Sequence, residues 1–313
     1  MATIDSFSNS LHLPLELERI IFKIAALVYP KSILSLILVA RRVKHWVEPL
    51  LYRVIMVIKS TSSLRQKTLD FPLLTLENLL AALAIRPPEF FQRSVQHLSI
   101  DGVVQPADLE AICTACNRVA DLFCKCYTPP PDVSPSFLRR FEQLSRLALT
   151  FHDFLASSLS CLGGITHLEL LGTGNNPSTG DLTAYLPLMP RLTHLSFDAV
   201  LRDWSLQTAL LATSNIQCIL LLASAEELSQ GIHHLDSFLR DDQRFLCLDQ
   251  QTDWREDRLR GVATGEDYWT LADAFIAARR EGRVDRSRCT LTDTDLSWRM
   301  YPERDSTAQS TAR

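Results

Sequence analysis

The sequence predicts an α/β protein in which a small helical bundle precedes a solenoid of alternating short parallel strands and helices. Three observations support this fold class: helical spacing of apolar residues near the N-terminus, a strand-like pattern that recurs along the rest of the chain, and a shortage of glycine. The 313 residues include ten glycines, about 3% against an average share of roughly 7%. Few glycines disfavour phosphate-binding loops, and they suit a chain of repeated helices and strands.

Residues 1–60 are expected to form a separate helical bundle. Pro14 suits the start of a helix, where its missing N–H is not needed, and apolar residues over 17–28 then recur at helical spacing. A second helix over 33–41 is apolar nearly all round and is therefore expected to be central, and a third, shorter helix follows it. Residues 1–60 carry a net charge of +4 and the remainder −8, which supports the boundary.

The same residues resemble an F-box, and in particular the F-box-like domains that are numerous in mushroom-forming fungi. The matching segments are Leu13-Pro14-x-Glu16-Leu17, Ile21-Phe22, Leu38-Val39-Ala40-Arg41-Arg42-Val43, Trp46 and Glu48-Pro49-Leu50-Leu51-Tyr52. The resemblance implies docking onto the Skp adaptor of a Skp–cullin–F-box ubiquitin ligase. By position, it implies the adaptor-facing residues Leu13, Pro14, Leu17, Ile21 and Val39. Many F-boxes carry Trp where this chain has Val43. The alternative is that these apolar residues only close the bundle.

An internal repeat organises the chain beyond a helical linker expected over residues 61–90. The pattern apolar-x-x-apolar-x-apolar begins at Val95, Val119, Leu144, Ile165, Leu192 and Ile216, and a degraded seventh copy covers 245–249. The spacings of 21 to 27 residues lie within the range of leucine-rich repeats. One strand–helix unit cannot bury its own apolar face, so we expect stacked units that form an irregular leucine-rich-repeat solenoid over residues 91–282. An ordinary two-layer α/β domain is the alternative.

Helical segments are expected between the repeat strands and after them. Those between strands cover 106–116, 136–142, 181–186 and 206–212. Segments 225–240 and 268–280 read as amphipathic helices, and a cap on the open end of the solenoid is their expected role. Residues 283–313 are polar and rich in Ser and Thr, and they are expected to form a disordered tail.

Side-chain alternation along the strands predicts a polar row on the concave face of the solenoid. The candidate substrate-binding residues are His97, Asp101, His167, Glu169, His194, Ser196 and Asp198. Neighbouring strands lie about 4.8 Å apart, so His167 and His194 should be neighbours, with His97 and Asp101 too far along the stack to join them. The row could recognise a protein substrate, or it could be the polarity that any exposed strand face needs.

Two further motifs have both a chemical and a structural interpretation. Cys113-x-x-Cys116 with Cys124-x-Cys126 has the spacing of a four-thiolate zinc site. The repeat, however, places Cys124 where sister copies have Ile or Leu, so we expect core packing. The glycine-rich stretch 172–180 follows a strand but has no Lys, so we expect an elongated turn and no nucleotide site.

The sequence therefore predicts a non-catalytic adaptor that binds a Skp adaptor through its N-terminus and an unidentified protein substrate through its repeats. We expect no catalytic residues, metal or cofactor, because no catalytic or phosphate-binding motif is present. A net charge of −4 disfavours nucleic acid, and no apolar run approaches the roughly 20 residues that a bilayer requires. The lack of a signal-peptide pattern favours the cytoplasm or nucleus. The alternative is an interaction scaffold whose bundle does not bind the ligase.

Overall fold

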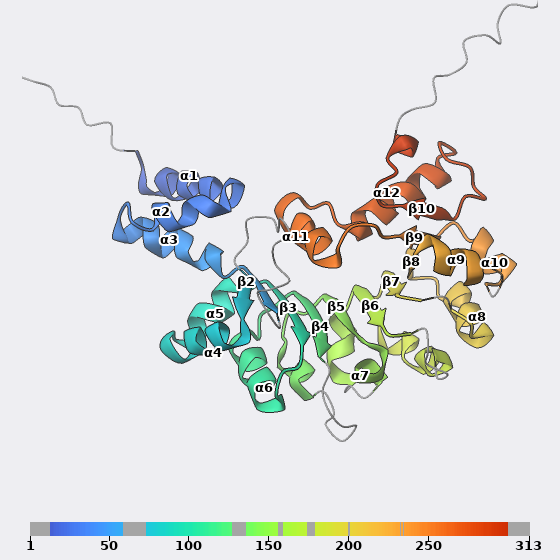
Figure 1. Ribbon diagram of the computed structural model, residues 1–313, viewed down its shortest axis with the longest axis horizontal. Coiled ribbons are helices and arrows are strands. Elements are labelled where there is room, and N and C mark those ends of the chain that lie inside the picture. The colour runs from blue at the N-terminus through green and yellow to red at the C-terminus, as the bar shows by residue number, and fades with distance from the viewer. Residues whose placement is uncertain are drawn as a thin grey trace, which may run out of the picture.

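A long parallel sheet organises the protein (Figure 1). The computed structural model describes residues 13–299 except 59–72, 127–135, 156–158, 174–178, 200, 232 and 234. Within these described residues the sheet has ten strands, and every neighbouring pair is parallel. The strands are β1 Val54–Ile58, β2 Leu73–Thr75, β3 His97–Gly102, β4 Asp121–Cys126, β5 Arg146–Thr150, β6 His167–Leu171, β7 His194–Phe197, β8 Cys218–Leu222, β9 Phe245–Asp249 and β10 Thr290–Thr292. Strands β3 to β10 follow chain order, and β1 lies between β2 and β3.

The six repeat copies and the degraded seventh copy coincide with strands β3 to β9, so the predicted α/β architecture of alternating strands and helices is confirmed. The strands pair in register, with Leu98 beside Leu122 and Leu168 beside Leu195. Because the register repeats, equivalent apolar side chains stack along one face of the sheet and form the main core. The consecutive strand order gives a curved, solenoid-like stack (Figure 1).

Short helices cover the outer face of this stack (Figure 1). They are α4 Leu76–Ile85, α5 Pro88–Ser94, α6 Pro106–Ala115, η3 Ser136–Arg140, α7 Phe151–Leu155, η4 Leu159–Gly164, η5 Thr179–Ala184, η6 Leu186–Leu188, α8 Trp204–Ala212, α9 Ala225–Gly231 and α10 Ser237–Asp241. All four helical segments expected between the strands contain helical turns. The single helix expected over 225–240 is instead two short ones, α9 and α10.

The expectation that segments 225–240 and 268–280 cap the open end of the stack is wrong: α9 and α10 pack on the main core of the outer face, and segment 268–280 lies over the concave face. Helices α11 (Trp254–Thr264) and α12 (Tyr268–Arg280) lie over the concave face (Figure 1). Helix α12 buries eight residues, among them Trp269 and Phe275, and it covers apolar side chains of β8 and β9. Beyond α12, residues expected to be disordered form strand β10 and the turn η8 (Ser297–Arg299), so the ordered part of the chain extends past residue 282.

Gly261 and Gly265 allow the tight turn between these two helices. A Cβ atom on Gly261 would lie 2.7 Å from the Cβ of Asp267, closer than side chains tolerate. Gly265 ends α11 with a φ of 80°, a left-handed conformation that glycine adopts without steric cost. Asp267 then caps α12 by accepting the Thr270 N–H at 2.9 Å.

The N-terminal helices α1 (Leu15–Val28), α2 (Ile33–Leu36) and α3 (Arg41–Leu51), with the turn η1 (Pro30–Ser32), pack around a small core of their own. Its buried members are Ala26, Ile33, Val43 and Val47. The second helix is shorter than expected and is not central, since Leu34 and Leu38 are exposed. The boundary expected at residue 60 also lies too late, because β1 is a strand of the sheet.

Aromatic packing and one ion pair attach these helices to the sheet. The ring of Tyr52 meets Phe90 and Phe91 edge to face, with centroids 5.1 and 5.7 Å apart. Arg86, at the end of α4, stacks on Phe90 and donates from Nη2 to Glu48 Oε1 of α3 at 2.7 Å. Edge-to-face pairs favour defined ring orientations, so the junction fixes the N-terminal helices relative to the repeats.

Replacement of Phe275 tests whether α12 belongs to the fold. Phe275→Ala removes a fully buried ring from the concave side, and a loss of about 3–5 kcal/mol in the free energy of unfolding is expected. Urea denaturation measures it, with Arg280→Ala on the exposed side of the same helix as the control. A loss below about 1 kcal/mol for Phe275→Ala would show that α12 is a dispensable cover.

Candidate functional site

The N-terminal helices expose many large apolar side chains to solvent. Helix α1 buries only Ala26, although most of its residues are apolar. The exposed large apolar side chains of this region are Leu13, Leu15, Leu17, Ile20, Ile21, Ile24, Leu27, Val28, Tyr29, Leu34, Leu38 and Val39. An exposed apolar patch of this kind marks a protein or membrane interaction site far more often than an ordinary surface. We call it the N-terminal apolar surface.

Four of the five residues implied as adaptor-facing, Leu13, Leu17, Ile21 and Val39, belong to this surface, and Pro14 is exposed beside Leu13. Leu17 and Ile21 are 48% and 53% exposed and one helical turn apart, and Val39 is 61% exposed beyond α2. Leu13 and Pro14 are exposed at the start of α1. Val43 lies on the opposite side, fully buried in the small core. The departure from Trp at position 43 therefore alters the inside of the bundle and leaves the exposed surface unchanged.

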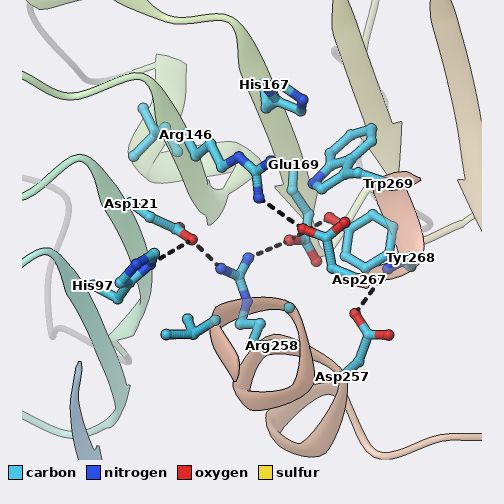
Figure 2. A pocket seen from close by; sticks show the side chains of 13 residues that line it. His97, Asp121, Arg146, His167, Glu169, Asp257, Arg258, Asp267, Tyr268 and Trp269 are labelled. Carbon is cyan, nitrogen blue, oxygen red and sulfur yellow. Dashed lines mark hydrogen bonds and ion pairs between the residues drawn. The ribbon is translucent and has the colours of Figure 1, made fainter. Parts of the chain in front are cut away.

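The concave face of the sheet carries a second cluster, which is charged. Alternation along the strands places His97, Asp121 and Glu169 on this face, where they meet Arg258 of α11 (Figure 2). Arg258 donates from Nη1 to Asp121 Oδ1 at 3.1 Å and from Nη2 to Glu169 Oε2 at 2.6 Å. Nδ1 of His97 lies 3.3 Å from the other oxygen of Asp121. One arginine therefore joins carboxylates from β4 and β6.

The pKa values of two groups in this cluster are shifted by their charged neighbours. Burial alone would raise the pKa of Asp121, but the charge of Arg258 and the hydrogen bond to His97 lower it to about 2. Burial, together with the Glu169 charge, raises the pKa of Tyr268 well above its ordinary value. The Tyr268 hydroxyl is therefore protonated and donates to Glu169 Oε2 at 2.9 Å.

His167 and His194 are neighbours, as the strand spacing predicted. Their rings stack with centroids 4.1 Å apart and an interplanar angle of 10°, and Trp269 meets both edge on. Nε2 of His194 lies 3.0 Å from Asp273 Oδ1 on α12. Burial, with the nearby His194 and Arg146 charges, lowers the pKa of His167 to about 3. The pair thus belongs to the contact between the sheet and α12.

Six of the seven candidate substrate-binding residues lie on the face that α11 and α12 cover, but they do not form an open row. Arg255 of α11 reaches Asp101 Oδ2 at 2.5 Å, and Ser196 is fully buried. Asp198 accepts the backbone N–H groups of Gly172 and Thr173 at 2.6 and 3.0 Å, which fixes the start of the loop after β6. The remaining four make the contacts described above. Substrate binding by these residues stays a prediction, and it requires the covering helices to move.

A small cavity lies between β3–β6 and the covering helices. It measures about 40 Å³ and is lined by the charged cluster with Arg146, Asp257, Asp267 and Trp269 (Figure 2). On this measure about 10–15 Å³ holds one water, so the space suits a few waters and is far below the roughly 300–1,000 Å³ of ordinary ligand pockets. Within the described residues no group of three or more His, Cys, Asp or Glu side chains could hold a metal ion.

The cysteines expected in the core lie there. Cys113, Cys116 and Cys124 are buried in the main core of the stack, and burial raises the pKa of Cys116 to about 12. The side chain of Cys126 and most of the glycine-rich stretch 172–180 lie outside the described residues. In the part of the chain that the structure describes, no helix is long and apolar enough to cross a bilayer.

Helix α11 supplies the residues of the candidate site that sequence reasoning missed, namely Trp254, Arg255 and Arg258. Charged side chains occupy five of its eleven positions, two of them on the side that faces the sheet, so its apolar periodicity was too weak to predict a helix. A local signal was present: Asp253 precedes the helix and accepts the Arg255 N–H at 2.8 Å, as helix-capping residues do. The partners on the sheet lie 89 to 154 residues earlier in the chain.

Comparisons with known proteins add no family to this description. No family model matches the chain, and searches among curated proteins and among solved structures found no match.

Removal of Arg258 tests the charged cluster. Arg258→Met leaves the carboxylates of Asp121 and Glu169 enclosed without their cation, and we expect a loss of about 3–5 kcal/mol of unfolding free energy at pH 7. The folded-state pKa of Asp121, about 2, lies below its unfolded value of about 3.9. The stabilisation is therefore complete above pH 4 and is lost as the pH falls through 2. Urea titrations should show the difference between the two proteins narrowing as the pH falls from 4 towards 2.

Two further variants make this measurement specific. Arg283→Met removes an exposed pair with Glu281 and should cost less than about 1 kcal/mol. Adding Asp121→Asn and Glu169→Gln to Arg258→Met removes the uncompensated charges and should restore much of the loss. A cost below about 1 kcal/mol for Arg258→Met alone would contradict the assignment.

Stability should also fall in mild acid because of His167. Its folded-state pKa of about 3 lies below the unfolded value of about 6.5, so protons bind the unfolded state preferentially and stability falls as the pH drops below 6.5. Between pH 7 and 5 we expect a loss of about 2 kcal/mol from this group. Urea denaturation at both pH values should show a shallower dependence for His167→Gln than for the exposed control His152→Gln. Equal slopes would show that His167 does not titrate in this way.

Proposed function

We propose that the protein is a non-catalytic adaptor that binds the Skp adaptor of a cullin ubiquitin ligase through the N-terminal apolar surface. The proposal depends on the exposure of α1. This helix has 14 residues, mostly apolar, yet only one side chain is buried and the others are at least partly exposed. A helix that is apolar on most sides is stable when other protein covers it. The missing cover is the proposed Skp adaptor.

The F-box resemblance and the exposure agree residue by residue. The motif positions that the resemblance assigns to the adaptor, among them Leu17, Ile21 and Val39, are exposed apolar side chains. They have no structural reason to be apolar, since the small core is filled by Ala26, Ile33, Val43 and Val47 with their half-buried neighbours. This division between core and surface supports a docking role for the exposed set.

The junction between the bundle and the repeats suits a proximity mechanism. An adaptor accelerates ubiquitin transfer by holding a substrate at high effective concentration near the enzyme, without chemistry of its own. The benefit depends on a defined geometry between the two binding ends. The packing of Tyr52 on Phe90 and Phe91 and the Arg86–Glu48 pair hold the N-terminal surface and the sheet in one arrangement.

Charge substitutions on the N-terminal apolar surface test the proposal. Leu17→Asp with Ile21→Asp places two carboxylates in the centre of the surface, and Skp-adaptor binding should weaken by about 30-fold or more. Both side chains are about half exposed, so the unfolding free energy should change by no more than about 0.5 kcal/mol each. Isothermal titration with a purified Skp adaptor measures the affinity.

Phe238→Asp is the matched control, because Phe238 is a 73% exposed apolar residue on α10, away from the N-terminal surface. This variant should bind the Skp adaptor as the unmodified chain does. If the unmodified chain shows no binding at all, the ligase role is excluded and the protein is an interaction scaffold.

A further inference from the structure

Helix α11 presents one mixed face to the concave side of the sheet. The residues of that face are Trp254, Arg255, Arg258, Leu259 and Val262, spaced as one side of a helix requires. Leu259 and Val262 contact Val54 and Met56 of β1. The contact of α11 with the sheet thus combines an aromatic ring, two arginines and two aliphatic side chains.

The sheet supplies a matching partner for each group. The ring of Trp254 stacks on Phe123, with centroids 4.1 Å apart and an angle of 17°, in an apolar patch completed by Ala148 and Leu171. Asp101 forms an ion pair with Arg255. Asp121 and Glu169 both form ion pairs with Arg258. The Arg258 guanidinium also lies 4.7 Å from the centroid of the Phe123 ring. We call this set of sheet residues, Phe123 with its three carboxylates, the concave receptor.

Helix α11 is held less firmly than its neighbour. It buries only Asp257 and Leu259, whereas α12 buries eight residues. Burial raises the pKa of Asp257 to about 6, and this desolvation offsets part of what the carboxylate gains from the Tyr268 N–H at 3.1 Å and from its ion pair with Arg260. Elements with few buried apolar contacts open first when a protein unfolds locally. Release of α11 leaves the buried contacts of α12 with β8 and β9 intact.

We propose that the concave receptor binds a helix of a partner protein that carries a tryptophan followed one and four residues later by arginine, and that α11 occupies the receptor until that partner displaces it. Proteins commonly recognise a partner helix by binding the side chains of one helix face, three or four residues apart, in a groove. The inference rests on the proposed function, since it assigns the chemistry of the partner that the repeats would present. The side chains of α11 that contact the receptor, Trp254, Arg255 and Arg258, define the side chains that the partner helix must carry.

Competition within the chain explains why such a partner must be specific. A tethered segment has an effective concentration on the order of millimolar, so an outside helix succeeds only when it reproduces the same contacts. A partner without the arginines would leave Asp101, Asp121 and Glu169 enclosed and unpaired, which costs several kcal/mol. The apparent affinity for any partner is reduced by the fraction of molecules in which α11 is released.

A labelled peptide provides a direct test on the full-length chain. The probe is a fluorescent peptide with the sequence of residues 253–265, and its binding is followed by fluorescence anisotropy. The triple variant Trp254→Ala, Arg255→Ala, Arg258→Ala empties the receptor in cis, and it should bind the peptide at least about tenfold more tightly than the unmodified chain. Glu256→Ala, at an exposed position of the same helix, should bind no better than the unmodified chain.

Two controls assign the binding to the receptor. A peptide in which both arginines are replaced by glutamate should lose at least about tenfold in affinity for the triple variant. Asp121→Asn with Glu169→Gln, added to the triple variant, should weaken binding of the original peptide by a similar factor. If the folded triple variant fails to bind the peptide, or binds the glutamate peptide equally well, the proposal is overturned.

Hydrogen exchange on the unmodified chain gives an answer that does not depend on any variant folding. Interior amides of α11 should exchange at least about tenfold faster than those of α12, since α11 opens by itself. Equal protection in the two helices would show that α11 leaves only on global unfolding, and it would overturn the proposal. Neither measurement involves a Skp adaptor, so failure here is distinguishable from failure of binding at the N-terminal apolar surface.

Discussion

The two faces of the parallel sheet impose different demands, and the rest of the structure follows from that difference. On the outer face every repeat supplies apolar residues to the main core, so each needs a covering helix. On the concave face the strands are apolar at the two ends, and the middle strands carry the charged residues beside a small apolar patch of Phe123, Ala148 and Leu171. Leu220 and Leu246 at one end need a cover, which α12 provides, and Met56 at the other end is covered by Leu259 of α11. The chain therefore returns across its own concave face.

Once both apolar ends are covered, the charged middle is enclosed as well, and its carboxylates need cations. Arg258 is the cation for carboxylates on two strands, since it pairs with Asp121 of β4 and Glu169 of β6. Tyr268 donates to the same glutamate from the first turn of α12. Pairs of this kind add little net stability beyond what well-packed apolar side chains would give, but they penalise any arrangement that leaves one partner alone. The ion pairs therefore determine the position of α11 on the sheet, although they add little to the free energy of docking.

The sequence was informative wherever a pattern was local. Apolar periodicity located strands β3 to β9, and alternation correctly placed His167 beside His194. The position of α11 and α12 could not be predicted in this way, because Arg258 and Glu169 are 89 residues apart and nothing in either segment identifies the other. The same limit applies to β1, whose residues look like the end of a helical bundle until β3 pairs with them. Burial of α12 also ordered residues around β10 whose composition resembles a disordered tail.

The two candidate surfaces differ in what binding costs. The N-terminal apolar surface is open, so a partner there gains its full apolar burial without breaking an internal contact. At the concave receptor a partner must first replace α11, and the ion pairs that it forms only match the ones that it breaks. The net affinity then comes from contacts that α11 does not make, while the broken pairs act against every incorrect partner. An adaptor built in this way would dock constitutively at one end and select its second partner at the other.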